Sequence, residues 1–111
     1  MKLKELSITP YPGRAFLAKS RKDFLKAYSA LFNQKCDLED GTDGYCAYGQ
    51  HSKDGSVIYL LWAQGMKTPI LAHELSHLIF MIFERVGIAP LSSGGEPFCY
   101  MMTHLLRQAG K

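Results

Sequence analysis

Residues 68–86 read TPILAHELSHLIFMIFERV, and the helix that this stretch predicts decides how the rest of the chain is arranged. Thr68 offers a capping hydroxyl, Pro69 suits the first helical position, and Gly87 suits the end of the helix. The apolar residues occupy nearly every side of the helix: Ile70, Leu71, Leu75, Leu78, Ile79, Ile82, Phe83 and Val86. Because a helix of this kind is normally buried, we expect it to lie at the centre of the fold.

The same helix carries His73-Glu74-Leu75-Ser76-His77, the HExxH pattern. Histidines four residues apart project from one face of a helix, about one turn apart, so both imidazoles can bind one metal ion. From the counts of histidine and glutamate in this chain, a chance match has a probability under about one per cent. Buried imidazoles and a buried carboxylate are costly unless they are paired, which favours Zn²⁺ held by His73 and His77 with Glu74 as general base. The alternative is a pair of ordinary histidines beside a good helix former.

Two histidines leave a tetrahedral zinc site short of one protein ligand. We expect Glu96 to supply it, from the start of the last helix and directly after the turn Ser92-Ser93-Gly94-Gly95. The alternative is local, because Ser93 and Glu96 also have the spacing of a capping box. His104, two turns later, is a second candidate ligand or a donor to a developing oxyanion, and the favoured alternative is an ordinary surface histidine.

Four further residues also carry side chains that such a site can use. Tyr100, one turn after Glu96, is a candidate catalytic residue that donates a hydrogen bond to the oxyanion or orients a ligand histidine, and ordinary packing explains it equally well. Glu84 shares the helical face of His73 and His77, but it lies about 10 Å along the axis from His77 and is too distant for the same ion. We interpret Cys99 and His51 as structural or incidental.

The remaining elements predict an α+β fold. A strand is expected at residues 14–18, and a helix begins at Ser20, whose hydroxyl caps it with Asp23 three residues later. The apolar runs 45–48 and 57–63 predict a β-hairpin, and the second run, VIYLLWA, indicates a strand covered on both faces. A last helix is expected at about residues 97–108, with its apolar stripe formed by Phe98, Met101, Met102 and Leu105.

The composition suits one ordinary globular domain, residues 1–111. A net charge of +3, spread along the chain, argues against a nucleic-acid partner. Three cysteines without a Cys-x-x-Cys pair favour a reducing cytoplasm over a disulfide framework. The first residues lack the apolar core of a signal peptide, and no apolar run is long enough for a membrane span. We therefore expect a cytoplasmic protein that binds neither membrane nor nucleic acid.

Two sequence segments resemble the gluzincin branch of the zincin metallopeptidases: AHELSH at residues 72–77, and GEPFCY at residues 95–100 with Glu96 nineteen positions after His77. The resemblance covers approximately residues 57–106, and it extends to small zincin-like proteins of phages and prophages with a similar E-P-F-x-Y segment. It implies a minimal zincin-like domain, in which a small, mostly antiparallel sheet packs on the HExxH helix and a following helix carries the third ligand. It also implies an extended peptide bound along the sheet edge, for which residues 57–63 or a neighbouring strand are the candidates.

The chain departs from that family in two respects. Many gluzincins have an aspartate four residues after the ligand glutamate, where this chain has Tyr100. The large C-terminal domain that completes the cleft of bigger family members has no counterpart in these 111 residues. We expect a zinc metallopeptidase that acts on a peptide or protein. The alternatives are a zinc-binding regulatory or interaction protein of a mobile element that does not cleave, and a metal-free helical interaction domain.

Overall fold

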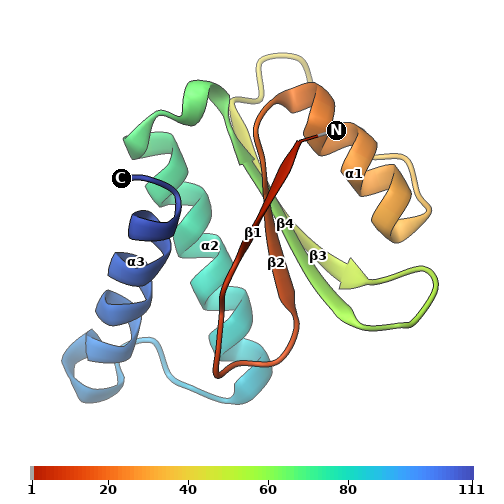
Figure 1. Cartoon of the computed structure of the whole chain (residues 1–111). Coiled ribbons are helices and arrows are strands. Elements are labelled where there is room, and N and C mark those ends of the chain that lie inside the picture. Colours follow the sequence, from red (N-terminus) through yellow and green to blue (C-terminus); the bar gives the residue numbers. More distant parts are fainter. Residues whose placement is uncertain (1) are drawn as a thin grey trace.

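The computed structural model describes residues 2–111 as a single sheet with helices on both faces (Figure 1). The strands are β1 (Leu3–Leu6), β2 (Arg14–Ala18), β3 (Gly44–Gln50) and β4 (Val57–Ala63). They are arranged in the order β1-β2-β4-β3, with β1 antiparallel to β2, β2 parallel to β4, and β3 antiparallel to β4. The α+β class is thus confirmed, and the sheet is mixed, with one parallel pairing at its centre.

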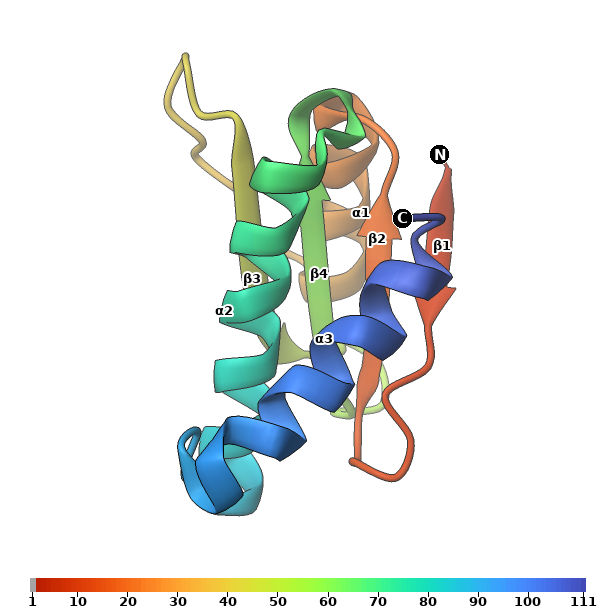
Figure 2. The same ribbon diagram turned by 90° about the vertical axis from the view of Figure 1, so that its left-hand side faces the viewer.

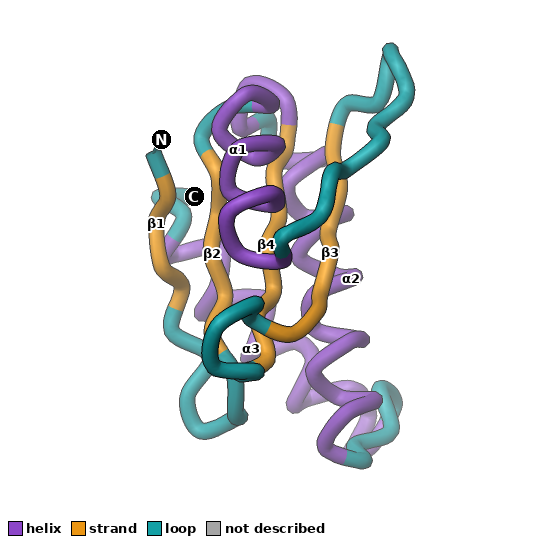
Figure 3. The backbone as a smooth tube through the Cα atoms, turned by 90° about the vertical axis from the view of Figure 1, so that its right-hand side faces the viewer, coloured by secondary structure: helices purple, strands orange, loops and turns teal. Residues whose placement is uncertain are grey.

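Three helices cover this sheet. Helix α1 (Arg21–Phe32) lies on one face, and α2 (Thr68–Val86) and α3 (Glu96–Gln108) lie together on the other (Figures 2 and 3). Short 3-10 turns at Gln64–Met66 and Ser92–Gly95 precede α2 and α3. None of the helices within residues 2–111 combines the length and the apolar character that crossing a bilayer requires.

The two faces of the sheet each bury an apolar cluster, and β4 belongs to both. Tyr59 and Leu61 pack on the side of α2 and α3, whereas Leu60 and Trp62 pack on the side of α1. Every residue of β4 after Val57 is buried, which confirms the expected strand covered on both faces. Because β4 lies between β2 and β3, it is not an edge strand; the edge beside α2 is its neighbour β3.

Several local predictions are confirmed. The Ser20 hydroxyl accepts a hydrogen bond from the Asp23 backbone N–H at 3.1 Å, at the start of α1. Gly87 ends α2 in a left-handed conformation, with φ of 81°. β3 and β4 form the expected hairpin, and Asp54 stabilises its turn by accepting hydrogen bonds from both the backbone and the hydroxyl of Ser56.

Other local predictions are wrong. Lys67, not Thr68, is the N-cap of α2, and it makes no side-chain cap hydrogen bond. Ser93 does not form a capping box with Glu96, because Gly95 is the N-cap and Ser93 itself has a positive φ of 53° within the preceding turn. Strand β1 was not expected at all.

Candidate metal centre

Helix α2 brings the two HExxH imidazoles together on its open face. The Nε2 atoms of His73 and His77 lie 3.2 Å apart, and the ring planes are inclined at 77°. Zinc–nitrogen bonds of 2.0–2.1 Å at a tetrahedral angle separate two ligand atoms by about 3.4 Å, so the pair has the spacing that one zinc ion requires. The same distance also fits an N–H···N hydrogen bond, which would satisfy the two rings when no metal is bound.

Both imidazoles are exposed, so the expectation that they are buried is wrong. The reason is the position of α2 at the side of the sheet: its core-facing residues pack against β4, while His73, His77, Phe80 and Glu84 follow one another along its solvent-facing side. Water and substrate can therefore reach the imidazole pair directly.

Glu74 differs sharply from its histidine neighbours, because it is the one charged residue of the described chain that is buried. Its exposed fraction is 6 %. Burial raises the pKa of the carboxyl above its ordinary value, while the charges of His73 and His77 oppose that rise. A carboxylate whose pKa is raised binds a proton more strongly, which suits a general base that operates near neutral pH.

Gly44 at the start of β3 allows Glu74 to occupy this position. A Cβ at residue 44 would lie 2.7 Å from Glu74 Oε2 and 3.1 Å from both Glu74 Cγ and Ile70 Cγ2. Strand β3 and helix α2 can therefore approach this closely only with glycine there. The sequence indicated only a turn in this region, so Gly44 and the neighbouring Asp43, which shares a hollow with His73 and Glu74, were not recognised as site residues.

A groove extends from this site along the line between α2 and β3. Three neighbouring hollows lie along it, and successive hollows share lining residues: Gly44, His73 and Glu74 line the first two, and Met81 lines the second and third. Cys46 lies on the floor, with its Sγ 3.9 Å from Met81 Sδ. Burial raises the pKa of the Cys46 thiol, so this cysteine is a neutral wall residue and not a nucleophile.

The structure does not bring Glu96 to the imidazole pair. Glu96 is exposed at the first residue of α3, and Phe98, two residues later, stacks on Phe80 of α2 at 5.2 Å between ring centroids. The start of α3 thus lies beside the second half of α2. Within residues 2–111 no set of three histidine, cysteine, aspartate or glutamate side chains is placed to hold a metal ion. The role of Glu96 as third ligand stays a prediction.

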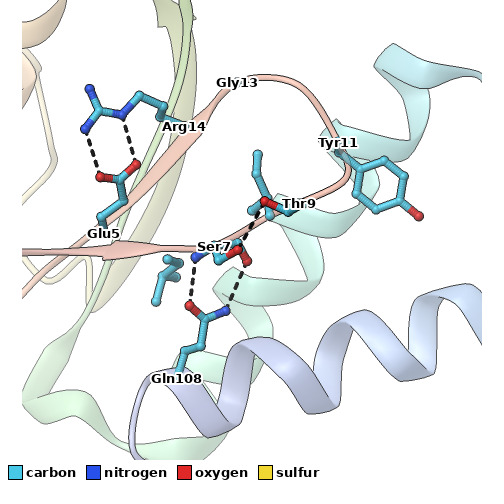
Figure 4. A pocket seen from close by; sticks show the side chains of 9 residues that line it. Glu5, Ser7, Thr9, Tyr11, Gly13, Arg14 and Gln108 are labelled. Atoms are coloured by element: carbon cyan, nitrogen blue, oxygen red, sulfur yellow. Dashed lines mark hydrogen bonds and ion pairs between the residues drawn. The ribbon is translucent and has the colours of Figure 1, made fainter.

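Tyr100 and His104 lie on another part of the surface, in a hollow shared with residues 9–11. Tyr100 is 72 % exposed there. His104 Nε2 lies 3.0 Å from the Ser7 carbonyl oxygen and 2.9 Å from Gln108 Nε2. Gln108 in turn bonds both the backbone N–H and the carbonyl of Ser7 (Figure 4). His104 therefore belongs to the packing of α3 against the β1–β2 connection, and Tyr100 is a solvent-exposed side chain beside it, so neither lies with the imidazole pair.

The remaining residues that the sequence singled out are also placed. Glu84 is exposed one turn beyond Phe80, Cys99 is an exposed free cysteine on α3, and His51 lies in the β3–β4 turn with its Nδ1 3.6 Å from Asp54 Oδ1. None of them contributes to the imidazole pair. No protein-family model, curated protein or solved structure matches the chain.

Proposed function

We propose that the protein is a zinc-dependent metallopeptidase in which His73 and His77 bind the metal and Glu74 is the general base. The observation that carries this proposal is the pair of Nε2 atoms, 3.2 Å apart, next to a buried carboxylate on the same helix. Burying a carboxylate without a partner destabilises the fold. A pair of histidines with a purely structural role gives no reason for a buried glutamate between them, whereas a metal-bound water would.

The chemistry assigned to the chain is the addition of water across a peptide bond. Bound zinc would supply Lewis-acid polarisation of the carbonyl and a lowered pKa of water. Glu74 removes a proton from the attacking water as the new C–O bond forms, and it delivers that proton to the nitrogen as the C–N bond breaks. The close approach of Gly44 to Glu74 leaves the carboxylate little room to move on the β3 side, which favours its use in both transfers.

The free edge of β3 is the proposed binding surface for the substrate. β3 pairs only with β4 in the described sheet, so its outward N–H and C=O groups remain available to an extended peptide. Backbone pairing of this kind binds peptides with little dependence on sequence. The edge lies directly beside the imidazole pair, because Gly44, Tyr45 and Cys46 line the same hollow as His73 and His77.

Glu96 is the proposed third ligand, and reaching the imidazoles requires a rearrangement of the turn Ser92–Gly95 that precedes it. Asp43 is the competing candidate, because it already lines a hollow with His73 and Glu74. Asp43 also contributes to the raised pKa of Glu74, after the effects of burial and of the two histidines. A carboxylate from either residue would complete the set of two histidines and one acidic ligand.

The substitution Glu74→Gln tests the assignment. It keeps the shape of the side chain and removes the base, so cleavage of a fluorogenic peptide should fall about 100-fold to 10,000-fold while zinc content stays at the parent level. Glu39→Gln is the matched control, because Glu39 is exposed in the loop before β3. Cleavage by Glu74→Gln at the parent rate would contradict the proposal.

A second function, zinc binding without cleavage, is favoured by the separation of Glu96 from the imidazole pair. Such a protein would use the groove to hold a partner of the mobile element's host. It predicts that Glu74→Gln leaves the biological effect intact, and that the parent binds zinc and peptides without hydrolysing them. Loss of the effect in that variant would exclude this alternative.

A further inference from the structure

The groove between α2 and β3 ends in a pocket that neither the metal nor the general base uses. Its lining consists of five side chains: Tyr48, Tyr59, Met81, Glu84 and Arg85. The cavity measures about 190 Å³, which is enough for one large side chain. Met81 also lines the hollow of His73 and His77, so the two hollows are neighbours.

Tyr59 provides the most informative feature of this pocket. Its side chain is 1 % exposed, yet its hydroxyl makes no hydrogen bond to any other described residue and is not among the enclosed polar atoms without a partner. The hydroxyl therefore opens toward the cavity. Buried tyrosines normally find a hydrogen-bond partner, so a partner supplied by an incoming group would complete this one.

The charges around the pocket cancel. Glu84 and Arg85 both line it, and neither forms an ion pair within residues 2–111. Arg85 and Tyr59 line the same pocket, so a group bound there can contact both the guanidinium and the phenol. A charged side chain would be attracted by one residue and repelled by the other. A neutral ring with a polar end can instead bond the Tyr59 hydroxyl and either charged group, while its body packs on Met81 and Tyr48.

Strand pairing relates this pocket to the site of cleavage. Gly44, Cys46 and Tyr48 alternate along the α2 side of β3, and Tyr48 is the cross-strand partner of Tyr59, with their rings 6.4 Å apart. Residues of a strand that share a face are two apart. A peptide paired antiparallel to β3 would run toward Gly44, because antiparallel partners have opposite directions. The pocket then faces a residue two or three positions before the cleaved bond.

We propose that this pocket selects a neutral aromatic side chain, tyrosine above phenylalanine, two or three residues on the amino side of the cleaved bond. This specificity rests on the proposed peptidase function, although the pocket itself predicts preferential binding whether or not cleavage follows.

A set of quenched fluorescent peptides that differ at one position tests the selection. In the zinc-loaded parent, kcat/KM for tyrosine at the selected position should exceed that for alanine by about tenfold, with phenylalanine between them and both glutamate and lysine low. Tyr48→Ala should abolish the preference, because Tyr48 forms one wall of the pocket. Tyr48 is 63 % exposed, so its removal should leave the core undisturbed. Tyr59→Phe should remove the advantage of tyrosine over phenylalanine, because it deletes the hydroxyl that the incoming polar end would bond. Arg107→Gln, an exposed arginine on α3, is the control and should retain the full preference.

Binding separates a failure of the pocket from a failure of the peptidase function. Fluorescence polarisation with the zinc-loaded Glu74→Gln variant should give tighter binding of the tyrosine peptide than of the alanine peptide, and Tyr48→Ala in that background should remove the difference. If the parent cleaves nothing but this binding preference holds, the peptidase function fails and the pocket stands. Equal binding of the two peptides, or a preference that survives Tyr48→Ala, overturns the pocket whatever the cleavage result.

Discussion

The two sides of the helical face of this protein each carry histidines, and they use them differently. On the α3 side, His104 lies within hydrogen-bonding distance of the Ser7 carbonyl and of Gln108. On the β3 side, the Nε2 atoms of His73 and His77 face each other. The hydrogen bonds of a histidine with backbone and amide partners are already satisfied by the fold. Two imidazoles directed at one point have instead the geometry of two ligands that share one metal ion. The direction of the ring nitrogens, more than the presence of histidine, therefore distinguishes a candidate metal site from packing.

The largest effect should come from Glu96, the proposed third zinc ligand for the imidazole pair on the β3 side. With Glu96 as the third ligand, Glu96→Gln should weaken zinc binding by about a hundredfold, since even residues that only support metal ligands contribute tenfold to a hundredfold. Competition with a chromophoric chelator measures this. Asp43→Asn is the comparison, and it should leave the affinity unchanged. The opposite pattern would assign the third bond to Asp43.

The packing of Glu74 on β3 gives the next effect. Gly44→Ala places a methyl group 2.7 Å from Glu74 Oε2, so the carboxylate must shift, and cleavage should fall about tenfold to a hundredfold while zinc is retained. Gly49→Ala is the matched control on the same strand, because its methyl group meets the Phe32 ring at 3.1 Å on the opposite face. Both variants should lose about 1–3 kcal/mol of stability. Equal losses of activity in the two variants would contradict the positioning of Glu74 by Gly44.

A substitution of His104 on the α3 side should change stability alone. His104→Ala removes the contacts with Ser7 and Gln108, and it should lower the free energy of unfolding by about 1 kcal/mol in chemical denaturation. Zinc affinity and peptide cleavage should match the parent. A loss of either would break the distinction between the two sides and return His104 to the candidate site.

The smallest effect concerns the surface ion pair of Arg14 and Glu5, which lines a hollow together with Gln108 on the α3 side. Arg14 donates two hydrogen bonds to Glu5 and thereby holds the pKa of the Glu5 carboxyl below its ordinary value (Figure 4). A lowered native pKa stabilises the fold above the unfolded-state value, and that stabilisation is lost as the pH falls through the native value. Glu5→Gln should therefore be slightly less stable than the parent at pH 7, and the difference should vanish in acid. Urea titrations across this range measure it, and a difference independent of pH would contradict the role of the pair.

The elements that the sequence predicted correctly are those with local signals. Ser20 and Gly87 mark helix ends through their own backbone or hydroxyl chemistry, and the run of buried residues in β4 needs no knowledge of its neighbours. Strand β1 has only four residues, and one of them, Leu6, is fully buried. Such a strand is defined by its pairing with β2, which no local pattern reveals.

The same rule holds for the candidate site, of which only the part with a local signal could be predicted. His73, Glu74 and His77 share one helix, so their spacing alone places them together. The positions of the Glu96 and His104 side chains depend on the orientation of α3 about its own axis and on where α3 packs against the rest of the fold. Eight residues correspond to about 80° of helical rotation, and this is enough to direct His104 toward Ser7 and away from the side of Glu96. Gly44 was missed because its role, a close approach of β3 to α2, exists only in three dimensions.

Calorimetric titration of the metal-free chain with zinc at neutral pH measures directly whether His73 and His77 bind a metal ion. If they do, each chain should bind one zinc ion, and that binding should be lost in His77→Ala but not in His104→Ala. A parent chain that binds no zinc, or a His77→Ala variant that binds it as tightly as the parent, would contradict the assignment of the imidazole pair as a metal site.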